Sequence, residues 1–172
     1  MKIFVIACAF ATVMAASAFA TPVDDVADAL VQAGTKPITA DSLPTDFARL
    51  TQFVRHDANG MILYTDGGPT DGYVRHAQAH FDLTPSVRKG ADKIPLFAVA
   101  FELADQTDFS FDGLASALEK RLGTPSVSSN RGGSVFRTWL LKQPAGRTFT
   151  IARAQASDNA ESITVVELIQ NR

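Results

Sequence analysis

The residues best suited to metal or acid–base chemistry in this chain are its three histidines, His56, His76 and His80. His76 and His80 have the H-x3-H spacing that, on a helix, would place both imidazoles beside one metal. However, residues 73–83 alternate between apolar and polar with a period of two, which predicts a strand. Four residues of strand separate two side chains by roughly 13 Å, too far for one zinc ion. We therefore expect solvent-facing histidines and no metal site; a small metal-dependent hydrolase using His56, His76 and His80 is the alternative.

The sequence lacks the nucleophile-elbow motif of hydrolases and the glycine patterns of nucleotide binding. There is no G-x-S-x-G motif. The pairs Gly67-Gly68 and Gly132-Gly133 match neither the dinucleotide-binding nor the P-loop spacing. Segment 66–72 contains aspartate and glycine but not in the ligand order of a calcium loop, so we expect a plain loop there. The sequence therefore predicts no catalytic residue and no cofactor.

The charged residues fall into two blocks of opposite sign. Residues 102–119 include acidic side chains and no basic one, whereas residues 120–153 include basic side chains and no acidic one. Within the basic block, Arg137 and the single tryptophan, Trp139, share one face of a predicted strand. Arginine and tryptophan are favoured at binding hot spots, and a basic face suits an acidic protein or an anionic glycan. The predicted binding residues are Arg137, Trp139, Arg147 and Arg153.

A structural role for the same residues is the other interpretation. Arg147 and Arg153 share their strand parity with Phe149 and Ile151, so the assignment of a basic face is not clean. Under this interpretation Trp139 packs beneath a helix and the arginines are solvated on the sheet.

The element around which the chain is organised is a helix near its middle. A predicted strand at 94–101 is followed by an amphipathic segment that begins near Ser110 or Asp112 and ends at Gly123 and Pro125. The apolar residues of this segment recur at helical spacing on one face: Phe111, Leu114, Ala115, Leu118 and Leu122. Such a face requires a sheet beneath it, so we expect Leu118→Asp to unfold the domain.

Further elements follow from turn residues and alternation. A first helix begins at Pro22 and ends by Gly34 and Pro37, and loops are expected at 35–46, 66–72 and 124–133. A hairpin is predicted around Asn59-Gly60. The predicted strands are 47–56, 61–65, 73–83, 94–101, 134–141, 147–154 and 162–169.

These elements predict an α+β fold, an antiparallel sheet with helices packed on one face. Residues 23–83 and 111–169 follow the same order of one helix and three strands, and both helices end near a Gly-Thr pair before a proline. A tandem duplicated α-β-β-β unit explains the similarity; a coincidence of common turn chemistry is the alternative.

The N-terminus has the features of a signal peptide. Lys2 precedes an apolar run over residues 3–16, and Ala18-Phe19-Ala20 has the form of a cleavage site. We predict a signal peptide at 1–20, a single domain at 21–172, and a periplasmic or secreted location. The single cysteine, Cys8, lies inside the predicted signal, so the mature chain is expected to lack thiol chemistry and disulfides.

The sequence as a whole predicts a non-enzymatic binding module: an inhibitor, an immunity-type protein or an envelope accessory protein acting through a sheet face or loops. With a formal net charge of −2, nucleic acid is not an expected partner. An envelope or secreted protein or an anionic glycan is expected instead, with no membrane span in the mature chain. A small ligand bound between helix and sheet is a third hypothesis. The oligomeric state is left open.

Overall fold

The computed structural model describes residues 22–58, 61–69, 73–82, 96–106, 108–131, 134–142, 146–155 and 162–170. The predicted signal peptide lies outside these residues. The helices are α1 (Pro22–Gly34), α2 (Leu43–Asp46) and α3 (Phe111–Leu122). The strands are β1 (Thr51–Ala58), β2 (Met61–Pro69), β3 (Val74–Asp82), β4 (Ala98–Ala104), β5 (Val127–Arg131), β6 (Ser134–Leu141), β7 (Arg147–Gln155) and β8 (Ser162–Gln170).

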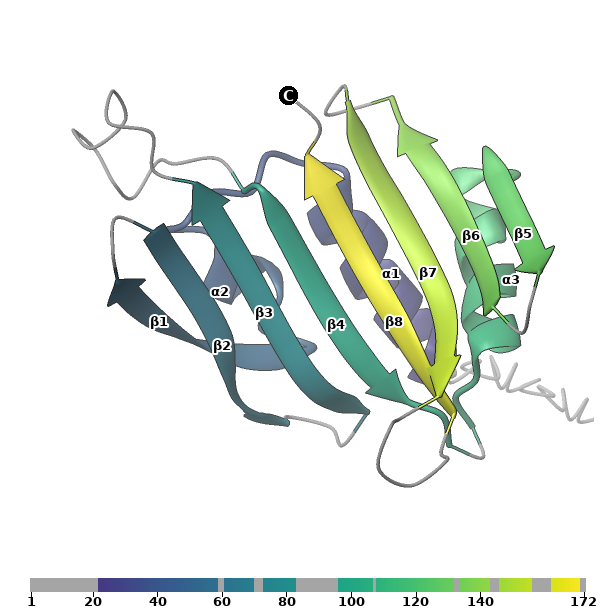
Figure 1. The fold of residues 1–172 in the computed structure, drawn as a ribbon, viewed down its shortest axis with the longest axis horizontal. Coiled ribbons are helices and arrows are strands. Elements are labelled where there is room, and N and C mark those ends of the chain that lie inside the picture. Colours follow the sequence, from purple (N-terminus) through teal and green to yellow (C-terminus); the bar gives the residue numbers. More distant parts are fainter. Residues whose placement is uncertain are drawn as a thin grey trace, which may run out of the picture.

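The strands form one antiparallel sheet in the order β1-β2-β3-β4-β8-β7-β6-β5. The helices lie behind this sheet, on one of its faces, which confirms the expected α+β class (Figure 1). In each half of the chain a helix precedes four strands that pair in sequence order. The halves join where β4 pairs with β8, with Phe101 opposite Val166. None of the helices in the described part of the chain has the length and apolar character needed to cross a bilayer.

Helix α3 forms where its sequence predicts. The Ser110 hydroxyl accepts a hydrogen bond from the Gly113 amide at 3.2 Å, which satisfies one of the free N–H groups of the first turn. Gly123 ends the helix with φ of 82°, a conformation that glycine adopts without strain. Leu114 and Leu118 are fully buried against the sheet. Burying each of these side chains contributes roughly 1.5–3 kcal/mol, more than helix propensity supplies.

Helix α1 packs on strands that belong to the other half of the chain. A side-chain carbon added at Gly34 would lie 3.4 Å from Leu168 on β8 and 3.6 Å from Phe149 on β7. The guanidinium of Arg147, also on β7, donates to the carbonyls of Gly34 at 2.9 Å and Lys36 at 2.6 Å. The end of α1 is therefore fixed to the second half of the sheet.

The first half of the sheet is covered by α2 and the residues around it. The Phe47 ring lies 5.1 Å from the Phe101 ring, centroid to centroid, and the Tyr64 hydroxyl donates to the Ala40 carbonyl at 2.7 Å. Ile38, Leu43 and further residues of this segment are buried in the same core. The two halves therefore share one core although different elements cover them.

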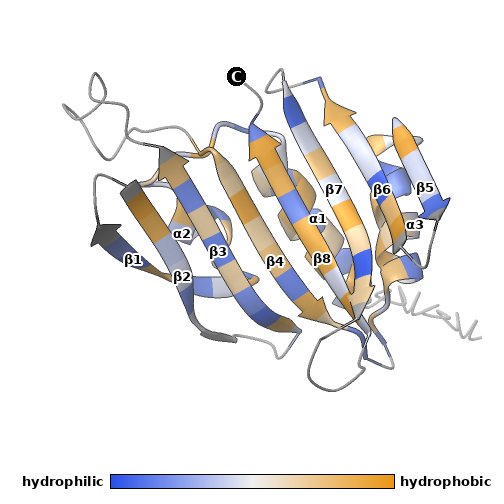
Figure 2. Cartoon of the chain, viewed as in Figure 1, coloured by the Kyte–Doolittle hydropathy of each residue, from blue (hydrophilic) through white to orange (hydrophobic). Residues whose placement is uncertain are grey.

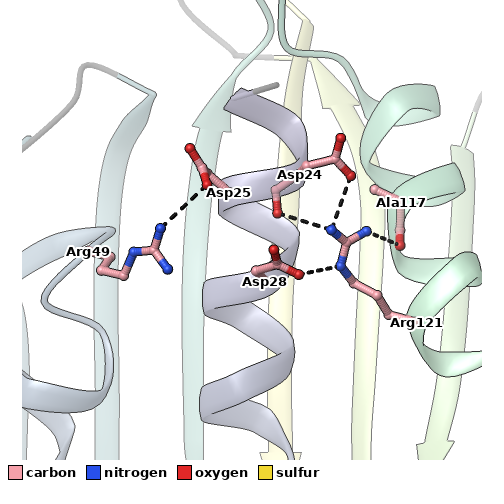
Figure 3. Close-up of polar contacts among 6 residues, drawn as sticks. All are labelled: Asp24, Asp25, Asp28, Arg49, Ala117 and Arg121. Atoms are coloured by element: carbon pink, nitrogen blue, oxygen red, sulfur yellow. Dashed lines mark hydrogen bonds and ion pairs between the residues drawn. The ribbon is translucent and has the colours of Figure 1, made fainter. Parts of the chain in front are cut away.

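Ion pairs hold α1 between its neighbours (Figure 3). Arg121 of α3 lies 2.6 Å from Asp28 and 3.1 Å from Asp24, and Arg49 lies 3.4 Å from Asp25 on the other side of the helix. The hydrogen bond that Arg121 donates to Asp28 raises the pKa of its guanidinium above the ordinary value, burial opposes this shift, and the bond to Asp24 acts in the same direction as that to Asp28.

Several predicted boundaries are corrected by the structure. The segment 124–133, expected as a loop, contains β5, which forms by pairing with β6. The expected loop 35–46 contains α2, and β2 continues to Pro69 through residues expected in the loop 66–72. The predicted hairpin is confirmed by the pairing of Ala58 with Met61, while Asn59 and Gly60 lie outside the described residues.

Candidate functional site: the helix-free face of the sheet

Strand alternation assigns the side chains to the two faces of the sheet. On β4, Val99, Phe101 and Leu103 are buried beneath the helices, so Ala98, Ala100 and Glu102 point the opposite way. This opposite side, uncovered by any described helix, is termed the helix-free face (Figure 1). Figure 2 shows β4 and β8 as mainly hydrophobic strands, and β3 as one on which hydrophilic and apolar residues alternate.

The strand register orders the helix-free face into three rows that cross the sheet. The central row runs from β1 to β5: Val54, Thr65, Gln78, Ala100, Glu167, Thr150, Thr138, Val127. The His80 row contains His56, Leu63, His80, Ala98, Ile169, Thr148 and Leu140. The Glu102 row contains His76, Glu102, Val165, Ala152, Phe136 and Ser129. None of the three rows includes a lysine or an arginine.

Large apolar side chains are exposed at both ends of this face. Leu140 is 60% exposed, Val127 51% and Val54 46%. Between them the central strands present small residues, such as Ala98, Ala100 and Ala152, as well as larger ones such as Ile169 and Glu167. Apolar contact area is therefore exposed toward both edges of the sheet.

A hollow of about 380 Å³ opens on the helix-free face between β2, β3, β4 and β8. It forms where β2 and β3 part: their pairing stops at Thr65 and Gln78, and the next residue, Asp66, accepts the Ala77 amide at 3.0 Å through its carboxylate. The residues lining the hollow are Thr65, Asp66, His76, Ala77, Gln78, Ala100, Glu102, Val165 and Glu167.

Acidic groups dominate the electrostatics of the hollow. Asp66, Glu102 and Glu167 contribute three carboxylates, and the imidazole of His76 lies 3.6 Å from the Asp66 carboxylate. Carboxylates accept hydrogen bonds from ammonium and guanidinium groups and form charge-assisted pairs with them. The hollow is therefore suited to a cation rather than to an anion.

His76 and His80 are exposed strand residues on this face, as predicted, and His56 is exposed near the end of β1, but the register keeps the histidines apart. His56 and His80 both pair with Leu63, so two strand spacings, roughly 10 Å, separate them. Among the described residues, no three His, Cys, Asp or Glu side chains lie close enough to hold a metal ion. The positions of His56, His76 and His80 therefore give no support to the alternative of a metal-dependent hydrolase.

The predicted binding residues lie on the other face of the sheet, among the helices. Trp139 is 2% exposed, and its indole N–H donates to the Gly123 carbonyl at 2.7 Å. Arg147 is 3% exposed, and burial lowers the pKa of its guanidinium. Two of the four residues are thus inside the protein, where they support α3 and α1.

Arg153 and Arg137 have intramolecular contacts as well. Arg153 lies 4.9 Å above the Phe111 ring and 2.7 Å from the Asp112 carboxylate, and Arg137 donates to the Phe136 carbonyl at 3.0 Å. The structure therefore does not bring the four residues together as a surface for a partner. Their placement favours the structural interpretation, and a binding role for these four residues stays a prediction.

Sequence reasoning missed Glu102 and Glu167 as members of one site. The alternation of His76, Gln78 and His80 correctly indicated an exposed strand face. The predicted strand 94–101 ends one residue before Glu102, which lies within β4. The pairing of β4 with β8, which brings Glu167 beside it, joins distant segments and leaves no local signal.

Comparisons of the chain with protein-family models, with curated proteins and with solved structures found no match. The site is therefore interpreted from its own geometry.

Proposed function

We propose that this protein is an exported, non-enzymatic binding module that contacts its partner through the helix-free face. Export to the periplasm or the external medium follows from the charged start, apolar run and Ala18-Phe19-Ala20 of the N-terminus. A protein of the envelope or the medium is then the expected class of partner.

The observation that best supports binding is the combination of exposed apolar side chains with the absence of lysine and arginine from the three rows of this face. Leu140 and Val127 lie on adjacent strands, β6 and β5, and both are more than half exposed. A sheet face that only meets water is usually covered by polar and charged side chains, whereas an exposed apolar patch marks an interaction site. The helix-free face has such a patch on β5 and β6, separated from its acidic hollow by β7.

A pull-down from the host's envelope extract and medium tests this proposal. The purified protein is expected to capture a saturable partner, and Val127→Ser with Leu140→Ser to weaken capture about tenfold. The matched control, Gln32→Ser with Glu119→Ser, changes exposed residues on the helices and is expected to bind as the unchanged protein does. Equal capture by both double variants, or no saturable partner at all, would refute the proposal.

The symmetry of the strand order supports a tandem duplication, in which each unit is one long helix followed by four strands and the short α2 is an addition to the first half. This unit has one strand more than the expected α-β-β-β unit, because β4 and β5 complete the two halves. If the halves descend from one folding unit, residues 21–104 and 105–172 expressed as separate chains are expected to associate into the native fold. Failure of the two fragments to associate would count against the duplication.

A further inference from the structure

Five acidic residues on the helix side of the protein have cations beside them. Asp24 and Asp28 pair with Arg121, Asp25 with Arg49, Asp46 with Lys36, and Asp112 with Arg153. Glu102 and Glu167 have neither an ion pair nor a side-chain hydrogen bond with another described residue, as is also true of the exposed Asp41 and Glu119. Unlike that separated pair, Glu102 and Glu167 line one hollow on the helix-free face.

The register places Glu102 and Glu167 around one small residue. Ala100 pairs with Glu167 across the β4–β8 ladder, and Glu102 follows two residues later on the same face of β4. Side chains on such a diagonal lie roughly 7–8 Å apart. A cation above Ala100 is therefore within reach of both carboxylates, in the hollow that Thr65 and Gln78 line from the other side.

An apolar surface lies at a fixed distance from that point. Along the central row, Thr150 and Thr138 separate Glu167 from Val127, so three strand spacings, roughly 14 Å, lie between the carboxylate and the exposed valine. Leu140 extends the apolar area on β6. A ligand that covers both regions must present a positive group and apolar groups at this separation, which an extended or helical polypeptide can do.

A second copy of this chain does not present that chemistry through the three rows of the same face. Face-to-face association of two copies would bring the carboxylates of Glu102 and Glu167 toward those of the other copy, and neither face has a lysine or arginine in its three rows to compensate them. Like charges juxtaposed across an interface cost several kcal/mol. Charge complementarity therefore selects a basic partner.

We propose that the helix-free face docks a basic, apolar-containing polypeptide segment, which places a lysine or arginine between Glu102 and Glu167 and apolar side chains over Val127 and Leu140. This inference rests on the proposed function and names the chemistry of the partner. Because it depends on charge as well as on apolar contact, the two contributions can be separated by experiment.

The test uses the purified mature protein and a fluorescent peptide of alternating lysine and leucine, long enough to span the hollow and β5. Two further peptides replace the lysines by glutamate or the leucines by serine. Glu102→Gln with Glu167→Gln is expected to weaken the lysine–leucine peptide about tenfold or more, as is Leu140→Ser. Asp41→Asn with Glu119→Gln, exposed positions away from this face, makes the same change in net charge and is expected to leave the affinity within about twofold.

Each outcome separates the inference from the proposed function. A glutamate–leucine peptide that binds as tightly as the lysine–leucine peptide, but is weakened by Leu140→Ser, overturns the cationic partner and leaves the binding face standing. Binding that none of the face variants changes overturns the proposed function itself. Undetectable binding of the lysine–leucine peptide overturns the inference. So does a dimer of the protein that forms without peptide and is abolished by Leu140→Ser, because a second copy would then occupy the face.

Discussion

Arg121 Nε lies 2.6 Å from Asp28 Oδ1, which joins two residues 93 positions apart in the chain. The same guanidinium donates to the side chain of Asp24 at 3.1 Å and to the carbonyl of Ala117 at 2.8 Å, within its own helix (Figure 3). Because α1 begins the first half of the chain and α3 begins the second, this residue ties the two halves together on the helix side of the sheet.

Replacing Arg121 by alanine is expected to lower the free energy of unfolding by about 1 kcal/mol, since it removes ion pairs that are partly open to solvent. The effect should shrink at high salt, which screens such pairs. Urea denaturation at low and high sodium chloride measures both quantities. Arg49→Ala is the matched control: Arg49 and Asp25 are both more than half exposed, so a smaller loss is expected. An equal loss for both variants would contradict the role of Arg121.

Leu118 tests whether α3 depends on its buried face. The side chain is fully buried, so Leu118→Ala is expected to cost about 2–5 kcal/mol through lost burial and the cavity left behind. Leu118→Asp is expected to abolish folding, because it places an unpaired charge beneath the helix. Circular dichroism during thermal melting checks both variants. Glu119→Ala, the exposed neighbour, should melt as the unchanged protein does, and an unchanged melting temperature in Leu118→Ala would contradict the assignment.

Arg147→Lys is expected to lower stability by about 1–3 kcal/mol, because one ammonium group cannot replace the guanidinium at the carbonyls of Gly34 and Lys36 and at the Gln170 side chain. The loss should also depend on pH. Burial lowers the pKa of Arg147, and it would lower the pKa of a lysine there in the same way.

The direction of that pH dependence follows from proton binding. Between the lowered pKa of the lysine in the folded state and its unfolded value of about 10.4, the unfolded state binds more protons, so stability rises with pH. Arginine stays charged throughout this range. The deficit of Arg147→Lys relative to the unchanged protein should therefore narrow as urea midpoints are measured from neutral pH upward. A deficit that stays constant or widens would show that residue 147 is not desolvated.

The fluorescence of Trp139, the single tryptophan, distinguishes the structural interpretation of this residue from the binding interpretation. Because it is buried and bonded to the Gly123 carbonyl, its fluorescence should be blue-shifted and resist acrylamide quenching in the folded protein. The lysine–leucine peptide should leave this emission unchanged. Strong quenching in the native state would instead place Trp139 on the surface, as the binding interpretation required.

The sequence predicts well those elements whose determinants lie within a few residues of one another. Ser110 and Gly123 bracket α3, and the apolar spacing between them identifies its buried face. The alternation from His76 to His80 likewise predicts the exposed side of β3. In these cases capping and burial act locally, so each element is visible in its own segment.

The sequence does not predict features that depend on distant partners. The strand β5 has a single apolar residue, Val127, and forms because its backbone pairs with β6. Arg147 is buried because the end of α1 supplies carbonyl acceptors from 113 and 111 positions away. Arg147 and Phe149 have the same strand parity, which predicts that they share one face of the sheet. Parity does not predict which of the two faces the helices cover. The hollow was missed for the same reason.

The pairing of β4 with β8 has a consequence for how the protein is made. β8 follows every other described strand in the chain, yet its place is in the middle of the sheet. Until it is synthesised, β4 and β7 each present a long strand edge with unsatisfied hydrogen-bonding groups, a template for aggregation. A chain truncated before Ser162 would keep both of these strand edges unpaired, so it is expected to aggregate rather than to fold as a shorter domain.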